Sequence, residues 1–258
     1  MKSIGKLALI GMFCLASCNN ASRKSEKSIA KATPKEANSE VVNTSETKQT
    51  TGITKAFVLG KFDFTTNPSF TKIGAPYASK NLYLKKETFN AFKKMYEAAK
   101  KDGVTLTIIS GTRNFNYQKG IWERKWEKYK DLEPLERAKK ILEYSSMPST
   151  SRHHWGTDMD INNLNNSYFE SGAGRKVYNW LQQHAHSYGF YQVYTDKSTG
   201  RPGYSMEKWH WSYTSLAKQY LNFYNENINY SDINGFKGSE LAKDLYVIKL
   251  YVNGVNKM

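Results

Sequence analysis

The sequence predicts an α+β fold, a compact single domain in which helices flank a small and mainly antiparallel sheet. Three observations lead to this prediction. Segments with helical periodicity and short β-branched or aromatic runs both recur along the chain. They are interleaved without the regular strand–helix alternation that builds parallel sheets. Hydrophobic residues make up 39% of the 258 residues, which is enough for a sizeable core.

Local residue patterns predict the secondary structure of residues 56–109. Residues 56–79 contain two prolines and several aromatic residues, so we expect irregular structure there. Apolar residues recur on one helical face over residues 82–101, and Asp102-Gly103 ends this expected helix. The β-branched run VTLTII over residues 104–109 predicts a buried strand.

The same two patterns continue to the end of the chain. Helical spacing predicts a helix that begins at Asn114 and runs to about residue 130, and a helix that ends at Gly189 after residues 174–188. Further helices are expected over 135–144, 214–225 and 239–250. Strands are expected over 159–161, 190–194 and 208–212. No apolar run reaches the roughly 18–20 residues of a membrane-spanning helix, which excludes a polytopic membrane protein.

Residues 1–17 have the composition of an export signal. A basic start precedes the short apolar run LALIGMFCL, and small residues precede Cys18. The ending Leu-Ala-Ser-Cys resembles a bacterial lipobox. That resemblance implies cleavage before Cys18, lipidation of its thiol, and a membrane-anchored lipoprotein on the exported side of the cell envelope. An ordinary signal peptide, cut nearby, is the alternative.

Residues 18–55 then form an expected flexible tether, because they are polar and contain almost no large apolar side chains. The folded domain is expected over residues 56–258. A formal charge of +15 favours anionic partners such as wall polymers or acidic headgroups, or simply keeps the domain soluble; nucleic acid suits an exported protein least. The two cysteines, Cys14 and Cys18, lie in the leader region, which excludes a disulfide framework or a cysteine nucleophile.

Three side chains suggest a metal centre on the sheet. His153, Asp160 and His210 together provide two imidazoles and a carboxylate, the donor set of a catalytic zinc that keeps a fourth position for water. Glu207 lies three residues before His210, where a carboxylate outside the ligand set can accept the proton of that water. Taken alone, each of these residues is weak evidence, because a single histidine is more often a structural or surface residue than a metal ligand.

Neighbouring residues leave alternatives open. On a strand, Asp158 and Asp160 point to the same side, so either can approach the metal and Asp158 can instead orient a ligand. Adjacent strand residues face opposite ways, so only one of His153 and His154 should bind. His184 and His186 lie in a helical pattern, where two positions are about 200° apart and cannot converge on one ion.

Three ordered motifs add a family resemblance. They are Ser-Gly-x-Arg-x-x-x-x-Gln over residues 110–118, Ser-x-His-x-x-Gly-x-x-x-Asp over 151–160, and Glu-x-Trp-His-x-x-Tyr over 207–213. This order resembles the VanY-type D-alanyl-D-alanine carboxypeptidases, which belong to the M15 zinc peptidases. The resemblance spans about residues 82–224. Thr112 and Asn114 depart from the family pattern beside Arg113, and Asp158 stands where a small residue is usual.

The resemblance implies a compact α+β fold and a role for each motif residue. It implies one Zn²⁺ ion bound by His153, Asp160 and His210, Glu207 as general base and then general acid, and a substrate site that includes Arg113, Ser151 and Gln118. It also implies a zinc-dependent D,D-carboxypeptidase that removes the terminal D-Ala from peptidoglycan stem peptides, without an obligate protein partner. An L,D-carboxypeptidase or peptidoglycan endopeptidase is the first alternative, and a wall-binding lipoprotein without catalysis is the second.

Overall fold

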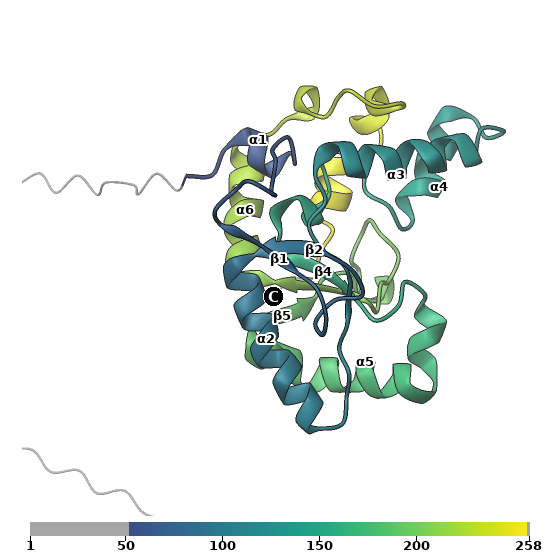
Figure 1. Cartoon of the computed structure of the whole chain (residues 1–258). Helices are drawn as coiled ribbons and strands as arrows, with labels where there is room; N and C mark the ends of the chain where they lie inside the picture. Colours follow the sequence, from purple (N-terminus) through teal and green to yellow (C-terminus); the bar gives the residue numbers. More distant parts are fainter. Residues whose placement is uncertain (1–51, 257–258) are drawn as a thin grey trace, which may run out of the picture. The chain divides into compact units, whose positions relative to one another are not determined.

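The computed structural model describes residues 52–256 (Figure 1). The expected signal peptide, Cys18 and nearly all of the expected tether therefore lie outside the described residues. Within the described part, no helix has the length and apolarity needed to cross a membrane.

A four-stranded antiparallel sheet forms the centre of the domain. Its strands are β3 (Ile108–Ser110), β4 (Asp158–Ile161), β6 (His210–Tyr213) and β5 (Phe190–Gln192), in that spatial order. The register pairs Asp160 with His210 and Asp158 with Ser212. A second, two-stranded antiparallel sheet joins β1 (Phe70–Ile73) to β2 (Leu82–Lys85). The predicted α+β class with small antiparallel sheets is confirmed.

Six α-helices surround the sheets in the described part. They are α1 (Lys55–Val58), α2 (Lys86–Lys101), α3 (Phe115–Lys128), α4 (Pro134–Leu142), α5 (Gly172–His184) and α6 (Thr214–Asn227). Figure 1 shows α6 and α2 along the left of the central sheet, α5 below it, and α3 with α4 above it. The helices thus flank the sheet, as the sequence predicts.

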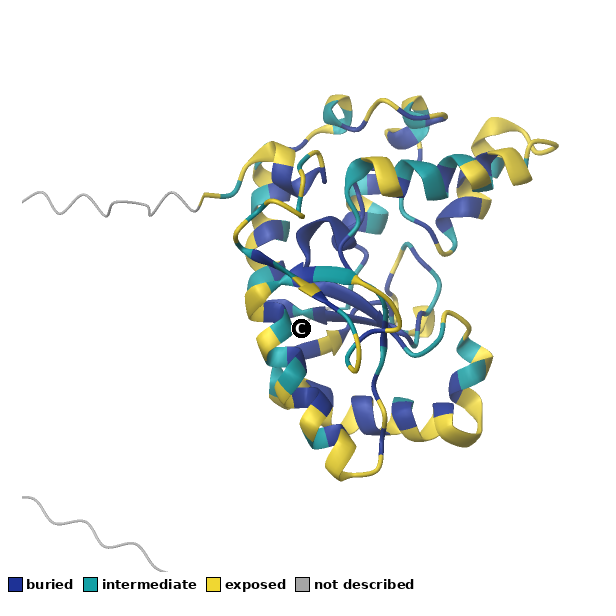
Figure 2. Cartoon of the chain, viewed as in Figure 1, coloured by how far each residue is buried: buried dark blue, intermediate teal, exposed yellow. Residues whose placement is uncertain are grey.

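The hydrophobic core is built from the apolar faces of helices that pack against the sheet. On α2, Phe92, Met95, Tyr96 and Ala99 are buried at helical spacing and pack toward the sheet strand residues Met159 and Ile161. Figure 2 shows this buried interior in dark blue between exposed outer faces. Burial of such side chains is the main favourable term in folding.

Helix α3 packs against the C-terminal segment through two tryptophans. It begins where the Asn114 side chain accepts a hydrogen bond from the Tyr117 amide at 2.9 Å, which confirms Asn114 as the cap. Trp122 and Trp126 are stacked beneath the C-terminal segment, and the Trp122 indole donates to the Lys237 carbonyl at 2.8 Å. Gly238 has φ of +77°, and a Cβ there would meet the Trp126 ring at 2.5 Å, so this packing needs glycine.

Several predicted boundaries are wrong. The expected helix over 82–101 starts only at Lys86, because residues 82–85 pair with β1 instead. The expected strand over 104–109 is reduced to β3, which begins at Ile108. Residues 56–79 contain α1 and β1 rather than only irregular structure.

The C-terminal prediction is also wrong. Instead of one helix over 239–250, the chain forms a short 3-10 turn at Ser239–Ala242 and a π-helical turn at Ile248–Val252. Tyr246 lies between them with φ of +49°, a left-handed conformation that no α-helix accommodates.

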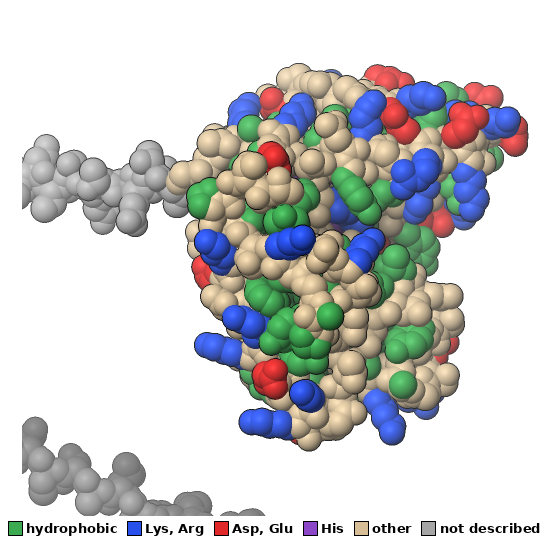
Figure 3. Space-filling view, in the orientation of Figure 1, with side chains coloured by type: hydrophobic (Ala, Val, Ile, Leu, Met, Phe, Trp, Pro, Cys, Tyr) green, Lys and Arg blue, Asp and Glu red, His purple; other side chains and the backbone are tan. Residues whose placement is uncertain are grey.

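Charged side chains are spread over the surface. Figure 3 shows lysine and arginine side chains scattered over the visible face, with several acidic residues gathered near the α4 end. Ion pairs such as Lys139–Glu136 at 2.8 Å are exposed and contribute little to stability.

Candidate metal centre

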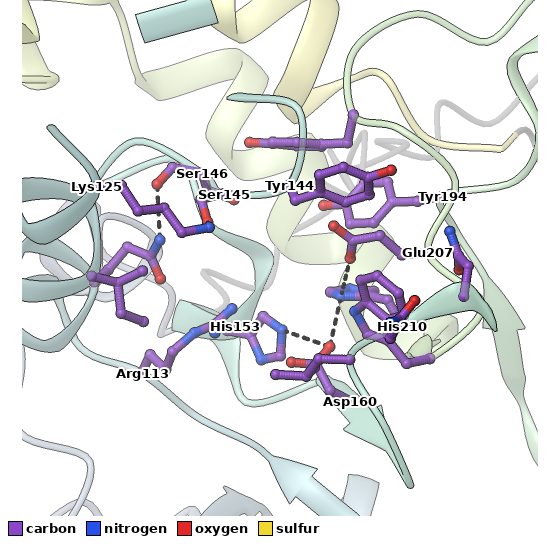
Figure 4. Close-up of a pocket in the computed structure, with 17 residues that line it drawn as sticks. Arg113, Lys125, Tyr144, Ser145, Ser146, His153, Asp160, Tyr194, Glu207 and His210 are labelled. Carbon is purple, nitrogen blue, oxygen red and sulfur yellow. Dashed lines mark hydrogen bonds and ion pairs between the residues drawn. The ribbon is translucent and has the colours of Figure 1, made fainter. Parts of the chain in front are cut away.

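Strand pairing brings the three predicted ligands together. Asp160 on β4 and His210 on β6 are direct partners across the antiparallel ladder. His153 lies on a 3-10 turn at Arg152–Trp155, just before β4. The Asp160 Oδ1 atom lies 3.4 Å from His153 Nε2 and 3.2 Å from His210 Nδ1. All three ligand atoms lie within 4.8 Å of one another (Figure 4).

The donor atoms fit a metal ion. His153 Nε2 and Asp160 Oδ1 are buried and have no hydrogen-bond partner. Unpaired buried polar atoms are rare because they lose their hydration without compensation. Here two of them face the same point, together with an imidazole nitrogen of His210. Two imidazoles and one carboxylate in a closed cluster suit a catalytic zinc with one position left open.

Hydrogen bonds on the far sides of the two imidazoles determine which nitrogen faces the cluster. His153 Nδ1 donates to the Gly111 carbonyl at 2.8 Å, which leaves Nε2 free to bind. His210 Nε2 donates to Asp158 Oδ1 at 3.0 Å, which leaves Nδ1 free. The two histidines therefore present opposite ring nitrogens, and each is oriented by a fixed partner.

Asp158 orients a ligand and does not join the cluster. Besides His210, its carboxylate accepts from Arg152 Nε at 2.9 Å, Thr157 Oγ1 at 2.6 Å and Ser212 Oγ at 3.1 Å. Burial alone would raise the pKa of Asp158, but Arg152 and these hydrogen bonds hold it below its usual range. Both aspartates point to one side of β4, as predicted, and the His210 ring lies between them.

This arrangement predicts the effect of Asp158→Asn. The amide oxygen can still accept from His210, but the charge that favours a basic imidazole is lost. We expect zinc affinity to fall about 10-fold to 100-fold, the usual range for such partners. Competition with a chromophoric chelator measures it. Asp196→Asn, at an exposed turn outside the site, is the matched control, and equal affinities of the two variants would refute this role.

Glu207 lies beside the cluster at the start of the β6 segment. Its Oε2 atom is 3.5 Å from His210 Nδ1, and its side chain is 7% exposed. The Glu207 amide donates to the Tyr194 carbonyl at 2.9 Å, and the Glu207 carbonyl accepts from Gln192 Nε2 at 3.0 Å. Burial raises the pKa of Glu207 to about 8, although His210 and other cations oppose it. A carboxyl group in this position can exchange a proton near neutral pH.

His154 is buried beside the cluster, but its ring nitrogens bind backbone groups of other segments instead of facing the cluster. Its Nδ1 donates to the Arg113 carbonyl at 2.6 Å, and its Nε2 accepts from the Ser149 amide at 3.1 Å. Burial lowers the pKa of His154 to about 3, so the ring is neutral. Of the two histidines, only His153 belongs to the cluster, but not for the reason that a strand would give. The pair lies on a 3-10 turn and not on a strand.

One cavity of about 550 Å³ contains most of the predicted site residues. Arg113, Gln118 and Glu207 line it together with the three ligands. The Gln118 side-chain amide donates to the Ser146 carbonyl at 2.8 Å. Ser151 is buried and does not line this cavity, and its hydroxyl has no hydrogen-bond partner.

The sequence reasoning missed several residues that line the cavity. Lys125 lies on α3, and Ser145 lies in the segment that follows α4. The Tyr194 ring packs 4.6 Å from that of His210. Lys125 follows Gln118 by two helical turns, so its position on the same face was a usable signal. His184 and His186 lie outside the cluster, on α5 and the following 3-10 turn, as predicted.

Comparisons with known proteins place the chain in a family. Residues 81–216 match the family model described as VanY, D-alanyl-D-alanine carboxypeptidase. A putative carboxypeptidase, YodJ of Bacillus subtilis, is 34% identical over 136 residues, covering 51% of this chain and 46% of the relative. A D-alanyl-D-alanine carboxypeptidase of Enterococcus faecalis is 29% identical over 124 residues, covering 47% and 45%. The chain thus spans less than half the length of these relatives.

A solved structure is also similar. A D,D-pentapeptidase VanY variant from a VanB-type resistance cassette, solved in complex with Zn(II), is 24% identical. The match covers 64% of this chain and 94% of that chain, with a TM-score of 0.46.

Proposed function

This chain belongs to the VanY family of D-alanyl-D-alanine carboxypeptidases, and from that premise we propose a zinc-dependent D,D-carboxypeptidase that removes the terminal D-Ala from peptidoglycan stem peptides. One observation carries the proposal. The unpaired donor atoms of His153 and Asp160 lie with His210 and Glu207 in the cavity that also contains Arg113. A ligand set, a proton acceptor and a carboxylate-binding group are the parts that this reaction requires.

Glu207 has the central chemical role. A zinc ion, when bound by His153, Asp160 and His210, polarises a carbonyl group and makes a water molecule more acidic. Glu207 accepts a proton from the attacking water and then delivers it to the leaving amine nitrogen. Its burial keeps bulk water away from the reacting groups.

Arg113 selects the free carboxyl end of the peptide. It lines the cavity, and its Nε is buried without a hydrogen-bond partner. Its backbone is held from both sides, because its amide donates to the His153 carbonyl at 3.1 Å and its carbonyl accepts from His154. A planar guanidinium can bind a carboxylate with two parallel hydrogen bonds, which a lysine cannot reproduce.

We therefore expect Arg113→Lys to lower kcat/KM for a stem pentapeptide about 10-fold to 100-fold, mainly through KM. The loss corresponds to about 1.5–3 kcal/mol for hydrogen bonds to a charged group. Steady-state kinetics measure it. Arg124→Lys, on the exposed side of α3, is the matched control and should behave as the wild type. Unchanged KM in Arg113→Lys would remove Arg113 from substrate binding.

The decisive experiment follows products by mass spectrometry. Purified protein is incubated with a pentapeptide that ends in D-Ala-D-Ala and with the matching tetrapeptide, with and without a chelator. Chelator-sensitive loss of one alanine from the pentapeptide supports the proposal. Loss from the tetrapeptide alone would indicate L,D-specificity. No cleavage of either, followed by cleavage of cross-linked muropeptides, would indicate an endopeptidase, and no cleavage at all would indicate a wall-binding protein.

We also propose that the peptidase domain over residues 56–258 is tethered to a membrane by a lipid on Cys18, on the exported side of the cell envelope. The lipobox-like ending and the polar segment up to residue 55 support this placement. Mass spectrometry of the membrane-extracted protein tests it, since an unmodified Cys18 would overturn it.

A further inference from the structure

Helix α3 presents a continuous row of side chains to the cavity. Gln118, Ile121 and Lys125 are spaced three and four positions apart, so they lie on one face of the helix. Arg113 precedes the helix cap and lines the same cavity. The wall therefore carries two cationic side chains, one at the start of the helix and one further along it.

Lys125 lacks the acidic partner that a half-buried lysine usually has. Among residues 52–256, no carboxylate oxygen lies within 4.0 Å of its Nζ. Arg113 likewise has no ion-pair partner in the described part. By contrast, Lys119 on the same helix pairs with Glu123 at 2.8 Å. Burial lowers the pKa of Lys125, although the charge of Glu207, which is beyond ion-pair distance, opposes this shift.

The fold nevertheless holds Lys125 in one place. Its Nζ donates to the Ser145 hydroxyl at 2.5 Å. The next residue, Ser146, is tied to the same helix by the hydrogen bond from Gln118. One of three ammonium hydrogens is thus used, and two are left for a partner in the cavity.

The charges of the cavity are divided between two sides. Figure 4 shows Arg113 and Lys125 on one side of His153, and Glu207 with His210 on the other. An anion bound between the two cations would sit beside the metal ligands and opposite the proton acceptor. That is where the leaving residue of a carboxypeptidase substrate must be, because its carboxylate is one residue beyond the scissile bond.

We propose that Lys125 and Ser145 complete a two-cation subsite with Arg113, which binds the terminal carboxylate of the substrate peptide. This inference rests on the proposed function, because it assigns the carboxylate to the leaving residue. It makes Lys125 a specificity-determining residue that distinguishes peptide acids from peptide amides. The carboxylate of the substrate would supply the negative charge that the half-buried Lys125 lacks within ion-pair distance in the described part of the chain.

Ligand binding to an inactive enzyme tests the subsite without turnover. Isothermal titration calorimetry measures Kd of the zinc-loaded full-length Glu207→Gln protein for the pentapeptide acid and for its C-terminal amide. Lys125→Met and Lys125→Arg are added to that background. Lys128→Met, on the exposed side of the same helix, is the matched control.

We expect Lys125→Met to weaken binding of the acid about 10-fold and binding of the amide less than 2-fold, as loss of one charge-assisted hydrogen bond implies. Lys125→Arg should recover most of the acid affinity, and Lys128→Met should change neither value. Equal weakening of acid and amide, or unchanged acid affinity, would overturn the proposal. Absence of hydrolysis by the wild type would remove the proposed function, whereas the acid–amide comparison would still decide the role of Lys125.

Discussion

Glu207→Gln should lose at least about 1,000-fold in kcat for the stem pentapeptide while it keeps its zinc. Glutamine fills the same space but cannot accept a proton from water or return one to the leaving amine. Glu207 lies 3.5 Å from a ligand nitrogen but is not one of the ligands, so the three donors stay in place. Steady-state kinetics and zinc analysis of the same preparation measure both outcomes. Wild-type turnover in this variant would contradict the proposed mechanism.

The metal-free protein provides the folding control for this variant. The folded-state pKa of Glu207, about 8, lies above its ordinary value of 4.5. Between these two values the folded state holds a proton that the unfolded state has released, so the unfolding free energy falls as the pH rises. Glutamine does not titrate.

The variant should therefore match the wild type near pH 4.5 and exceed it at pH 8, by an amount on the order of a few kcal/mol. Urea unfolding at both pH values measures this difference. A variant less stable than the wild type at pH 8 would show that glutamine disturbs the site, and its loss of activity could not then be assigned to chemistry.

Asp160→Asn should abolish stable zinc binding and reduce hydrolysis to background. The carboxylate is the one negatively charged donor in the cluster, and it lies between both histidines at 3.4 Å and 3.2 Å. Asparagine keeps the shape but removes the charge that a divalent cation requires. Zinc at about 1,000 times its Kd stabilises a folded protein by about 4 kcal/mol, and the variant should lose that increment.

Zinc analysis and thermal unfolding, each with and without added zinc, measure these effects. A chelator should remove zinc from the wild type and lower its thermal stability to that of the variant. Added zinc should then restore the zinc content and the stability of the wild type only. His184→Ala is the matched control, because His184 is an exposed histidine outside the cluster. Full zinc occupancy in Asp160→Asn would show that the metal binds elsewhere.

The chemistry of this site was more predictable than its geometry. Residue types alone left the site open, and the resemblance of three ordered motifs named His153, Asp160, His210 and Glu207. The resemblance also favoured Asp160 over Asp158, and the pairing of β4 with β6 gives the physical reason, because it places the His210 ring between the two carboxylates. Such pairings join distant parts of the chain and leave no local signal.

Local patterns failed where tertiary contacts decided the conformation. Residues 82–85 carry the apolar spacing of the following helix, yet they pair with β1 because strand partners were available. Tyr246 interrupts an otherwise helical pattern through its backbone conformation, which side-chain periodicity does not report. The spacing from Gln118 could have placed Lys125 on the cavity side of α3, but only the structure shows that no carboxylate oxygen among residues 52–256 lies within 4.0 Å of its Nζ.

The pairing of Asp160 with His210 also links metal binding to folding. The ligands come from separate segments, and only the closed ladder between β4 and β6 brings their donor atoms together. An unfolded chain therefore offers zinc only separate side chains, so zinc binding is coupled to closure of the loop between these strands. We expect a chain in which β4 and β6 have not paired to bind zinc weakly and to lack activity.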